Sequence, residues 1–148
     1  MNMKFLAGLV VSLLLSGSAF AVDNIDTADN PDLAPARARI DAKDYAGAIQ
    51  LLMPMITSTK SPDVFNLLGF SYRKSGDLTQ AATYYGKALD FDPNFKPTLE
   101  YQGEMYLQQG DVEHAKANLA KLATICPNGC EEREDLDKAI ASYKPVSN

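Results

Sequence analysis

Two cysteines are the residues of this 148-residue chain whose type and spacing are best suited to chemistry. Cys126 and Cys130 enclose Pro127, Asn128 and Gly129, which favour a tight turn, so we expect the two sulfur atoms to approach one another. A structural disulfide is the first interpretation. The second is a thiol redox centre or a metal-handling site, because Cys130 begins a predicted helix and thiolates bind copper(I). Against the second, acidic residues follow the pair directly and disfavour the thiolate, and no histidine or methionine lies beside it.

The other polar residues give no catalytic pattern. His114 is the single histidine, and it is predicted to face solvent on a helix. The sequence contains no glycine-rich phosphate loop, no nucleophile elbow and no pair of histidines with metal-ligand spacing. Aspartate and glutamate are placed as helix caps and on solvated faces, so their spacing supports no catalytic carboxylate pair. We therefore expect a protein that is not an enzyme and that uses no cofactor and no metal.

Residues 1–21 have the composition of an export signal. Lys4 precedes an uninterrupted run of mostly apolar residues from Phe5 to Leu15, and Ala19-Phe20-Ala21 is a small-x-small cleavage site. Such a run is too short to span a bilayer, although an uncleaved membrane anchor is the alternative. We expect cleavage after Ala21, no stable membrane insertion afterwards, and a periplasmic or secreted protein.

The charge balance is acidic. The chain has 14 lysine and arginine residues against 19 aspartate and glutamate residues, a formal net charge of −5. Phosphate backbones and anionic lipid attract clusters of basic residues, and this sequence has no such cluster. We therefore expect no nucleic-acid partner.

Helical periodicity is clearest between residues 62 and 93. Apolar and small residues recur there at helical spacing on both sides of a break at Ser75-Gly76-Asp77, which predicts two helices joined by a tight turn. The residues that carry the pattern are Phe65, Leu68, Gly69 and Tyr72 before the break and Ala81, Tyr85 and Ala88 after it. Gly76 can adopt a left-handed conformation there, and Asp77 can cap the second helix. Ser61 is predicted to cap the first.

The pattern recurs along the chain at a constant interval of about 34 residues, a period typical of stacked helical hairpins. Ala115 follows Ala81 by one such interval, and Pro127 follows Pro93 by the same interval. Ala48 precedes Ala81 by almost as much. The sequence therefore predicts a second hairpin of the same kind after the clear one and a related one before it.

The two ends of this array are predicted to differ from its middle. In the first hairpin Asp44 is a suitable N-cap, but Pro54 lies inside the helix that follows and should kink or shorten its last turn. Residues 131–143 are predicted to form a helix that covers the open end of the stack. Its apolar face consists of Leu136, Ile140 and Tyr143. The acidic residues in its first two turns match the helix dipole, and an acidic docking patch is the alternative.

These residues resemble the tetratricopeptide repeat. All eight signature positions of that family are filled in the clear hairpin, by Phe65, Leu68, Gly69, Tyr72, Ala81, Tyr85, Ala88 and Pro93. The third repeat departs from the pattern at Gln102, Leu119 and Leu122, and the first has Ala36 and Arg39 in place of the glycine and tyrosine. The resemblance implies an all-α protein, an α-solenoid of about three helical hairpins with a C-terminal capping helix. The run from Cys126 to Glu132 also looks like the tail of small exported bacterial repeat proteins.

The predicted domain limits follow from this pattern. We expect a signal peptide at 1–21, a flexible leader at 22–32, a repeat domain at 33–143 and a tail at 144–148. The repeats are predicted at 29–61, 62–95 and 96–129, and the capping helix at 131–143.

Glycines mark the expected close approach of the two helices in a hairpin. Gly69 and Gly103 lie where the first helix should cross the second, and Ala81 and Ala115 are expected to face them with small side chains. The aromatic residues of the stripe are expected to fill the core around these contacts.

The resemblance also implies that the protein binds another protein, because the first helix of each repeat lines a concave groove in this family. The groove positions correspond here to Asn66, Phe70, Arg73, Lys74, Glu100, Glu104 and Gln108. In the first repeat they correspond to Leu33, Arg37, Ile40 and Asp41. A groove that is basic on one helix and acidic on the next fits a peptide or helix of mixed charge better than a C-terminal carboxylate.

Phe70 is the most informative of these positions. It lies off the core stripe, so it is a candidate anchor for an apolar side chain of the partner, and packing against a neighbouring repeat is the alternative. The expected function is therefore a non-enzymatic adaptor or scaffold of the cell envelope. A thiol redox or metal-handling module built on Cys126 and Cys130 is one alternative, and a structural subunit that forms a homo-oligomer is another.

Overall fold

The computed structural model describes residues 31–145 of the chain, and within this range it contains helices and no strands. The predicted signal peptide, most of the predicted leader and the last three residues lie outside that range. The helices are α1 (Ala34–Asp41), α2 (Tyr45–Leu52), the 3-10 helix η1 (Met53–Thr57), α3 (Pro62–Lys74), α4 (Leu78–Phe91), α5 (Lys96–Gln108), α6 (Val112–Ile125) and α7 (Glu131–Ser142).

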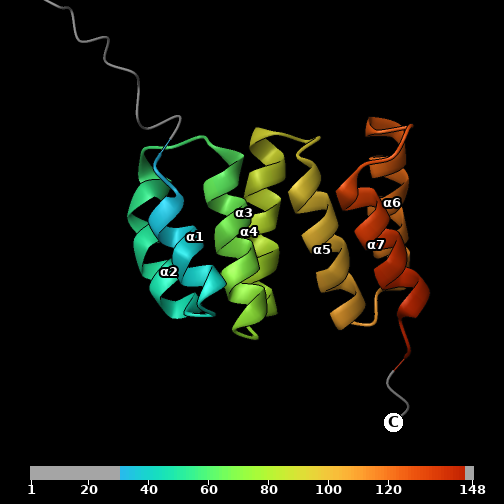
Figure 1. Cartoon of the computed structure of the whole chain (residues 1–148), viewed down its shortest axis with the longest axis horizontal. Coiled ribbons are helices and arrows are strands. Elements are labelled where there is room, and N and C mark those ends of the chain that lie inside the picture. Colours follow the sequence, from blue (N-terminus) through green and yellow to red (C-terminus); the bar gives the residue numbers. More distant parts are fainter. Residues whose placement is uncertain (1–30, 146–148) are drawn as a thin grey trace, which may run out of the picture.

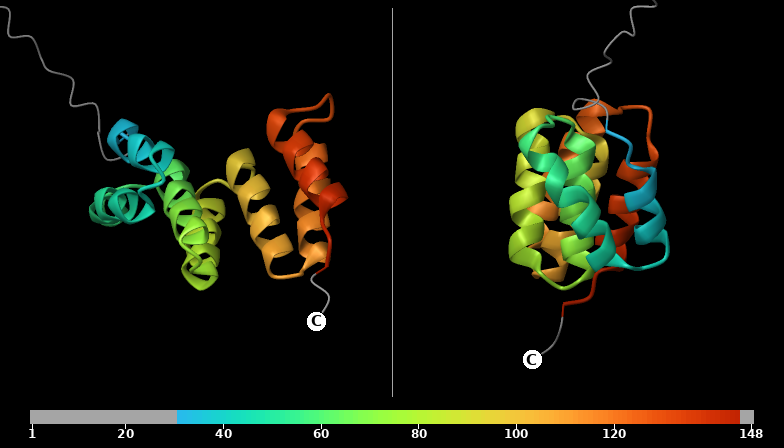
Figure 2. Two further views of the ribbon diagram at one scale, coloured as in Figure 1. Left: turned by 60° about the horizontal axis from the view of Figure 1, so that its bottom comes forward. Right: turned by 90° about the vertical axis from the view of Figure 1, so that its left-hand side faces the viewer.

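The helices form a row of hairpins (Figure 1). The pairs α1/α2, α3/α4 and α5/α6 follow one another along the long axis, and α7 packs against both α5 and α6 at the C-terminal end. In the end-on view of Figure 2, α1 and α7 lie toward one side of the stack and α4 toward the other. The predicted all-α solenoid of three hairpins and a capping helix is therefore confirmed.

Aspartate caps start the second helix of each hairpin. Asp44, Asp77 and Asp111 each accept a hydrogen bond from the backbone N–H three residues later, at 2.9, 3.0 and 3.1 Å. Gly76 precedes the second of these caps with φ of +90°, a conformation that favours glycine. Ser61, in contrast, makes no side-chain cap, so that prediction is wrong. The Ser61 N–H instead donates to Thr59 Oγ1 at 3.0 Å.

The first hairpin is the irregular one. Helix α2 ends at Leu52, and Pro54 lies in the 3-10 helix that replaces its last turn. Proline removes a backbone donor and clashes with the preceding turn of an α-helix, which explains the early end. The shortening that Pro54 predicts is therefore observed.

Gly69 brings α3 against α4, but its contact is not the expected one. A Cβ atom at residue 69 would lie 2.5 Å from Cδ1 of Tyr85, whose ring is completely buried. The missing side chain thus makes room for an aromatic ring, and Ala81 is buried beside that ring in the same cluster. The atoms nearest to Gly69 thus belong to the ring of Tyr85 and not, as expected, to Ala81.

Gly103 serves a different interface from the one predicted. A Cβ atom there would lie 2.6 Å from Cδ1 of Leu136 in α7, so the nearest neighbour of Gly103 is the capping helix and not Ala115 of α6. Leu136 is fully buried and packs with Leu99 and Leu122. The last core cluster is therefore shared by α5, α6 and α7.

Candidate partner-binding groove

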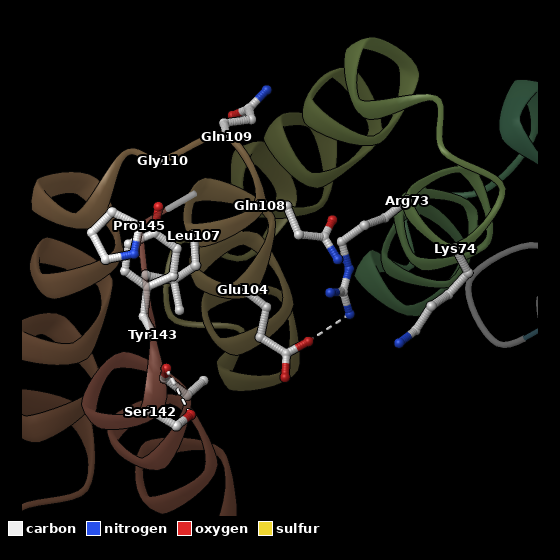
Figure 3. Close-up of a pocket in the computed structure, with 11 residues that line it drawn as sticks. Arg73, Lys74, Glu104, Leu107, Gln108, Gln109, Gly110, Ser142, Tyr143 and Pro145 are labelled. Atoms are coloured by element: carbon white, nitrogen blue, oxygen red, sulfur yellow. Dashed lines mark hydrogen bonds and ion pairs between the residues drawn. The ribbon is translucent and has the colours of Figure 1, made fainter. Parts of the chain in front are cut away.

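Two hollows lie along the helices that the sequence assigns to the groove, and we call this surface the groove face. The larger encloses about 780 Å³ between the C-terminal ends of α3, α5 and α7 (Figure 3). It is lined by Arg73, Lys74, Glu104, Leu107, Gln108, Gln109, Gly110, Ala139, Ser142, Tyr143 and Pro145. The smaller encloses about 290 Å³ between α1, α3 and α5. It is lined by Arg37, Ile40, Asp41, Leu67, Phe70 and Tyr101.

Phe70 both packs against the neighbouring repeats and lines the smaller hollow. Its ring centroid lies 6.4 Å from that of Tyr45 in the first hairpin and 5.0 Å from that of Tyr101 in the third. The side chain is half-buried, so one part of it contacts the neighbours and the rest reaches the hollow. The two interpretations of Phe70 are thus compatible in this fold.

Arg73 is held inside the structure. Its side chain is 2% exposed, and Nη2 lies 2.6 Å from Oε2 of Glu104 on the next repeat (Figure 3). The guanidinium also lies over the rings of Phe70 and Tyr101, 5.5 and 5.8 Å from their centroids. Arg73 is therefore not the free basic groove residue that the sequence predicts, because Glu104 neutralises it and the two rings cover it.

Asn66 joins two repeats. Its side chain is buried, and Oδ1 accepts a hydrogen bond of 2.9 Å from the hydroxyl of Thr98. Both residues are buried, so this bond fixes α3 against α5 away from water. The expectation that Asn66 faces the groove is wrong, since the start of α5 covers it.

Glu100 is buried as well and lines neither hollow. The pKa of its carboxyl is raised to about 8, mainly by loss of water around it and then by the charges of Glu104, Asp135 and Glu132, whereas the nearby Arg73 lowers it by less. A carboxyl in this position is mostly protonated at neutral pH. The predicted contrast of a basic α3 with an acidic α5 is therefore largely cancelled at Arg73, Glu104 and Glu100.

Among the predicted groove residues of the second and third repeats, Lys74 and Gln108 remain exposed. Both line the larger hollow, where Figure 3 shows them on either side of the Arg73–Glu104 pair. Lys74 Nζ lies 5.3 Å above the ring of Phe70, which links the two hollows across α3. These exposed side chains are the ones best placed to meet a partner.

Tyr101 and Tyr143 are groove residues that sequence reasoning missed. Tyr101 lines the smaller hollow, and Tyr143 lines the larger one instead of completing the core face of α7. Tyr101 could have been found, since it stands one repeat period after Leu67, which lines the same hollow. Tyr143 could not, because α7 ends at Ser142 and Tyr143 follows it in an extended conformation.

The cysteine pair lies between α6 and α7. The Sγ atoms of Cys126 and Cys130 are 2.03 Å apart, and Arg133 Nη1 donates to the carbonyl oxygens of Cys126 and Pro127 at 3.3 Å each. Between residues 31 and 145 no three His, Cys, Asp or Glu side chains gather as a metal site would require. His114 is exposed and contacts Asp111, with 2.6 Å between Nδ1 and Oδ2. The two sulfur atoms therefore lie at disulfide distance across the connection from α6 to α7.

None of the helices placed by the structure, from α1 to α7, is both long and apolar enough to cross a membrane.

The stacked hairpins and their lined face define a helical-repeat protein, an α-solenoid capped by one further helix. The model of the tetratricopeptide repeat family matches residues 62–95, the hairpin α3/α4. This hairpin is therefore similar to the tetratricopeptide repeat, and repeats of this family mediate interactions between proteins.

Part of the chain is also similar to one protein of a red alga, Pyropia yezoensis. The chain is 29% identical over 63 residues to the "Uncharacterized protein ycf37" of Pyropia yezoensis. The match covers 43% of this chain and 35% of that relative, so the chain spans about a third of the relative's length in this comparison.

Proposed function

We propose that the protein is a non-enzymatic adaptor of the cell envelope that holds a peptide or helix of a partner protein on its groove face. The observation that carries the proposal is the pair of hollows on the first helices of the repeats and α7, the smaller lined by aromatic rings and the larger by polar and apolar side chains together. An apolar anchor of the partner would enter beside Phe70 and Tyr101, and polar groups would meet Lys74 and Gln108.

The proposed cell-envelope location rests on the export signal that the sequence predicts at residues 1–21. In an oxidising compartment we propose that Cys126 and Cys130 form a structural disulfide, which fixes the start of α7 next to the end of α6. Because α7 supplies Tyr143 and Ser142 to the larger hollow, this link also sets the shape of the groove face.

Recovery of partners by matched variants tests this proposal. The double variant K74A/Q108A changes exposed groove residues, and the control T83A/E113A changes exposed residues on the second helices α4 and α6. Both should keep the thermal unfolding midpoint of the wild type, because none of the four residues is in the core. We expect the groove variant alone to lose at least one co-purifying protein. Equal recovery of every partner by both variants would contradict the groove assignment.

Self-association is the second candidate, and an exposed aromatic residue favours it. Phe91 at the end of α4 is 44% exposed, and its ring packs at 5.1 Å on Phe65 of the core. An apolar surface of this kind is a common contact between copies of a chain. The molar mass in solution across a concentration series tests self-association. A molar mass that rises with concentration in the wild type, and not in F91S, would support it.

A further inference from the structure

Asn128 and Gly129 lie in the exposed turn between α6 and α7. Both residues are exposed, and Gly129 has φ of +101°. The Gly129 N–H donates a hydrogen bond of 3.0 Å to the carbonyl oxygen of Cys126, which closes the turn. Cys126 and Cys130 enclose this turn, with their sulfur atoms at disulfide distance. An exposed side-chain amide is thus followed directly by a backbone nitrogen that no side chain shields.

An asparagine in this setting can lose its amide group without an enzyme. The backbone nitrogen of Gly129 gives up its proton and attacks Cγ of Asn128, a C–N bond forms, and the side-chain nitrogen leaves as ammonia. Water then opens the resulting five-membered imide ring at one of its carbonyl carbons. The product is aspartate, or isoaspartate in which the chain continues through the side-chain carbon. Glycine favours the attack because it has no Cβ atom beside the nitrogen.

A similar turn one repeat earlier provides an internal comparison. Asn94 is exposed as Asn128 is, and each of the two follows a proline. The Phe95 N–H donates to the carbonyl oxygen of Asp92 at 3.1 Å, so this turn is closed by the same kind of hydrogen bond. Phe95 places a bulky side chain beside the nitrogen, whereas Gly129 places none. Attack on Asn94 is therefore hindered, and we expect Asn94 to be stable.

We propose that Asn128 is a site of spontaneous deamidation whose rate is controlled by the Cys126–Cys130 pair. While the sulfur atoms are bonded, the short loop holds the Gly129 N–H on the carbonyl oxygen of Cys126, and a nitrogen held there is poorly placed to attack. A dithiol reduces the bond by supplying two electrons and two protons, and it becomes a disulfide itself. The opened loop releases the nitrogen, and deamidation accelerates. Asn128 lines neither hollow of the groove face, so the modification requires the proposed disulfide but not the proposed partner.

The new carboxylate would disturb the start of α7. Asn128 lines a hollow of about 360 Å³ together with Arg133, Glu134 and Asp137. Arg133 donates to two carbonyl oxygens of the turn at 3.3 Å each. A negative charge at residue 128 would be repelled by the two acids and would compete with the carbonyl oxygens for the guanidinium. We therefore expect deamidation to loosen the connection from α6 to α7.

Ageing of the full chain tests the proposed site. One sample keeps the Cys126–Cys130 bond, a second contains dithiothreitol, and both are held at about pH 8, because the attacking nitrogen must lose its proton. Trypsin then releases the peptide 122–133, and mass spectrometry measures replacement of the Asn128 amide by a hydroxyl. We expect conversion roughly fivefold faster in the reduced sample, the effect of losing one backbone hydrogen bond. Asn94 should stay unconverted in both samples.

Matched variants separate the chemistry from its structural effect. C126S/C130S should convert at the reduced rate without dithiothreitol, and N128Q should not convert, since glutamine would have to form a larger ring. N128D should lose protection from hydrogen exchange in α7, whereas N128S adds no charge and should keep it.

Equal rates in the oxidised and reduced wild type would overturn control by the cysteines. Absence of conversion at Asn128 in both samples, or equal conversion of Asn94, would overturn the site itself. Each of these results would leave the groove assignment unchanged, because none of them involves a partner.

Discussion

Gly103 of α5 and Leu136 of α7 touch so closely that a Cβ atom at residue 103 would lie 2.6 Å from Cδ1 of Leu136. Leu136 is completely buried by this contact. A terminal repeat leaves its apolar face in water unless another element covers it. The glycine of the third repeat therefore serves the capping helix, and α7 in turn completes the larger hollow of the groove face.

The variant G103A should lower the free energy of unfolding by about 1–3 kcal/mol, because the new methyl group overpacks the seam. This loss should appear even though alanine favours a helix by about 1 kcal/mol over glycine. Gly86 in α4 is the matched control, since a Cβ atom there would meet nothing within 4 Å. Urea unfolding should show G86A equal to or more stable than the wild type. A gain in stability for G103A would mean that α7 can shift at no cost.

The buried bond between Thr98 and Asn66 gives a second prediction. T98V removes the donor and leaves Asn66 Oδ1 buried without a partner, which should cost about 1–3 kcal/mol. N66L/T98V removes both polar groups and should cost less than the sum of the two single changes. A double-mutant cycle by urea unfolding measures this coupling. Strictly additive costs would show that the bond contributes nothing to joining the two repeats.

These two contacts also show which parts of the fold can be predicted from the sequence. The helix limits can be predicted, because the signals for them act on residues close by in the sequence. Examples are the aspartates that start helices, Asp44, Asp77 and Asp111, and Gly76, which ends one. The contact of Gly103 depends on what stacks over the last hairpin, and the repeat pattern holds no information on that. Hairpin limits are local properties, whereas contacts between repeats are not.

The groove residues divide in the same way. The family pattern places Phe70, Lys74 and Gln108 on a lined surface, since it fixes which side of each helix they occupy. It cannot tell that Arg73 is buried, because that depends on Glu104 in the next repeat lying within 2.6 Å. Burial of Glu100 depends likewise on α7, which is outside the repeat pattern. Charge across the groove therefore follows from pairs that only the folded stack brings together.

Glu100 predicts how stability changes with pH in the free protein. Its pKa is about 8 in the folded chain, above the ordinary value of 4.5 that it regains on unfolding. The folded state then binds more protons than the unfolded state between these values, so the free energy of unfolding falls as pH rises from about 4.5 to 8. E100Q lacks this contribution. Its stability relative to the wild type should grow from pH 5 to pH 9, as measured by urea midpoints.

A constant difference between E100Q and the wild type across that range would contradict the raised pKa. E113Q provides the baseline for this comparison, because Glu113 is exposed and its loss should leave the pH profile unchanged.

The cysteine pair should stabilise the capping helix locally. The double variant C126S/C130S is expected to lose about 2 kcal/mol, the value for closing so small a loop. The loss should appear as faster hydrogen exchange of amides in α7, with α3 and α4 unchanged, because the link joins only α6 to α7. Mass spectrometry of the protein isolated from its native cells reports whether the pair is oxidised. Free thiols in that sample would contradict a stabilising role of the pair. Hydrogen exchange that is faster to the same extent in all helices of the variant would contradict it as well.

Site-specific photo-crosslinking in the native cells tests the central claim most directly. A photo-reactive amino acid is placed at exposed groove positions, Lys74 and Gln108, and at exposed positions on the second helices, Thr83 and Glu113. The groove-face account predicts a crosslinked partner protein of defined mass from positions 74 and 108 and none from positions 83 and 113. The same crosslinked protein from all four positions, or from 83 and 113 alone, would contradict it.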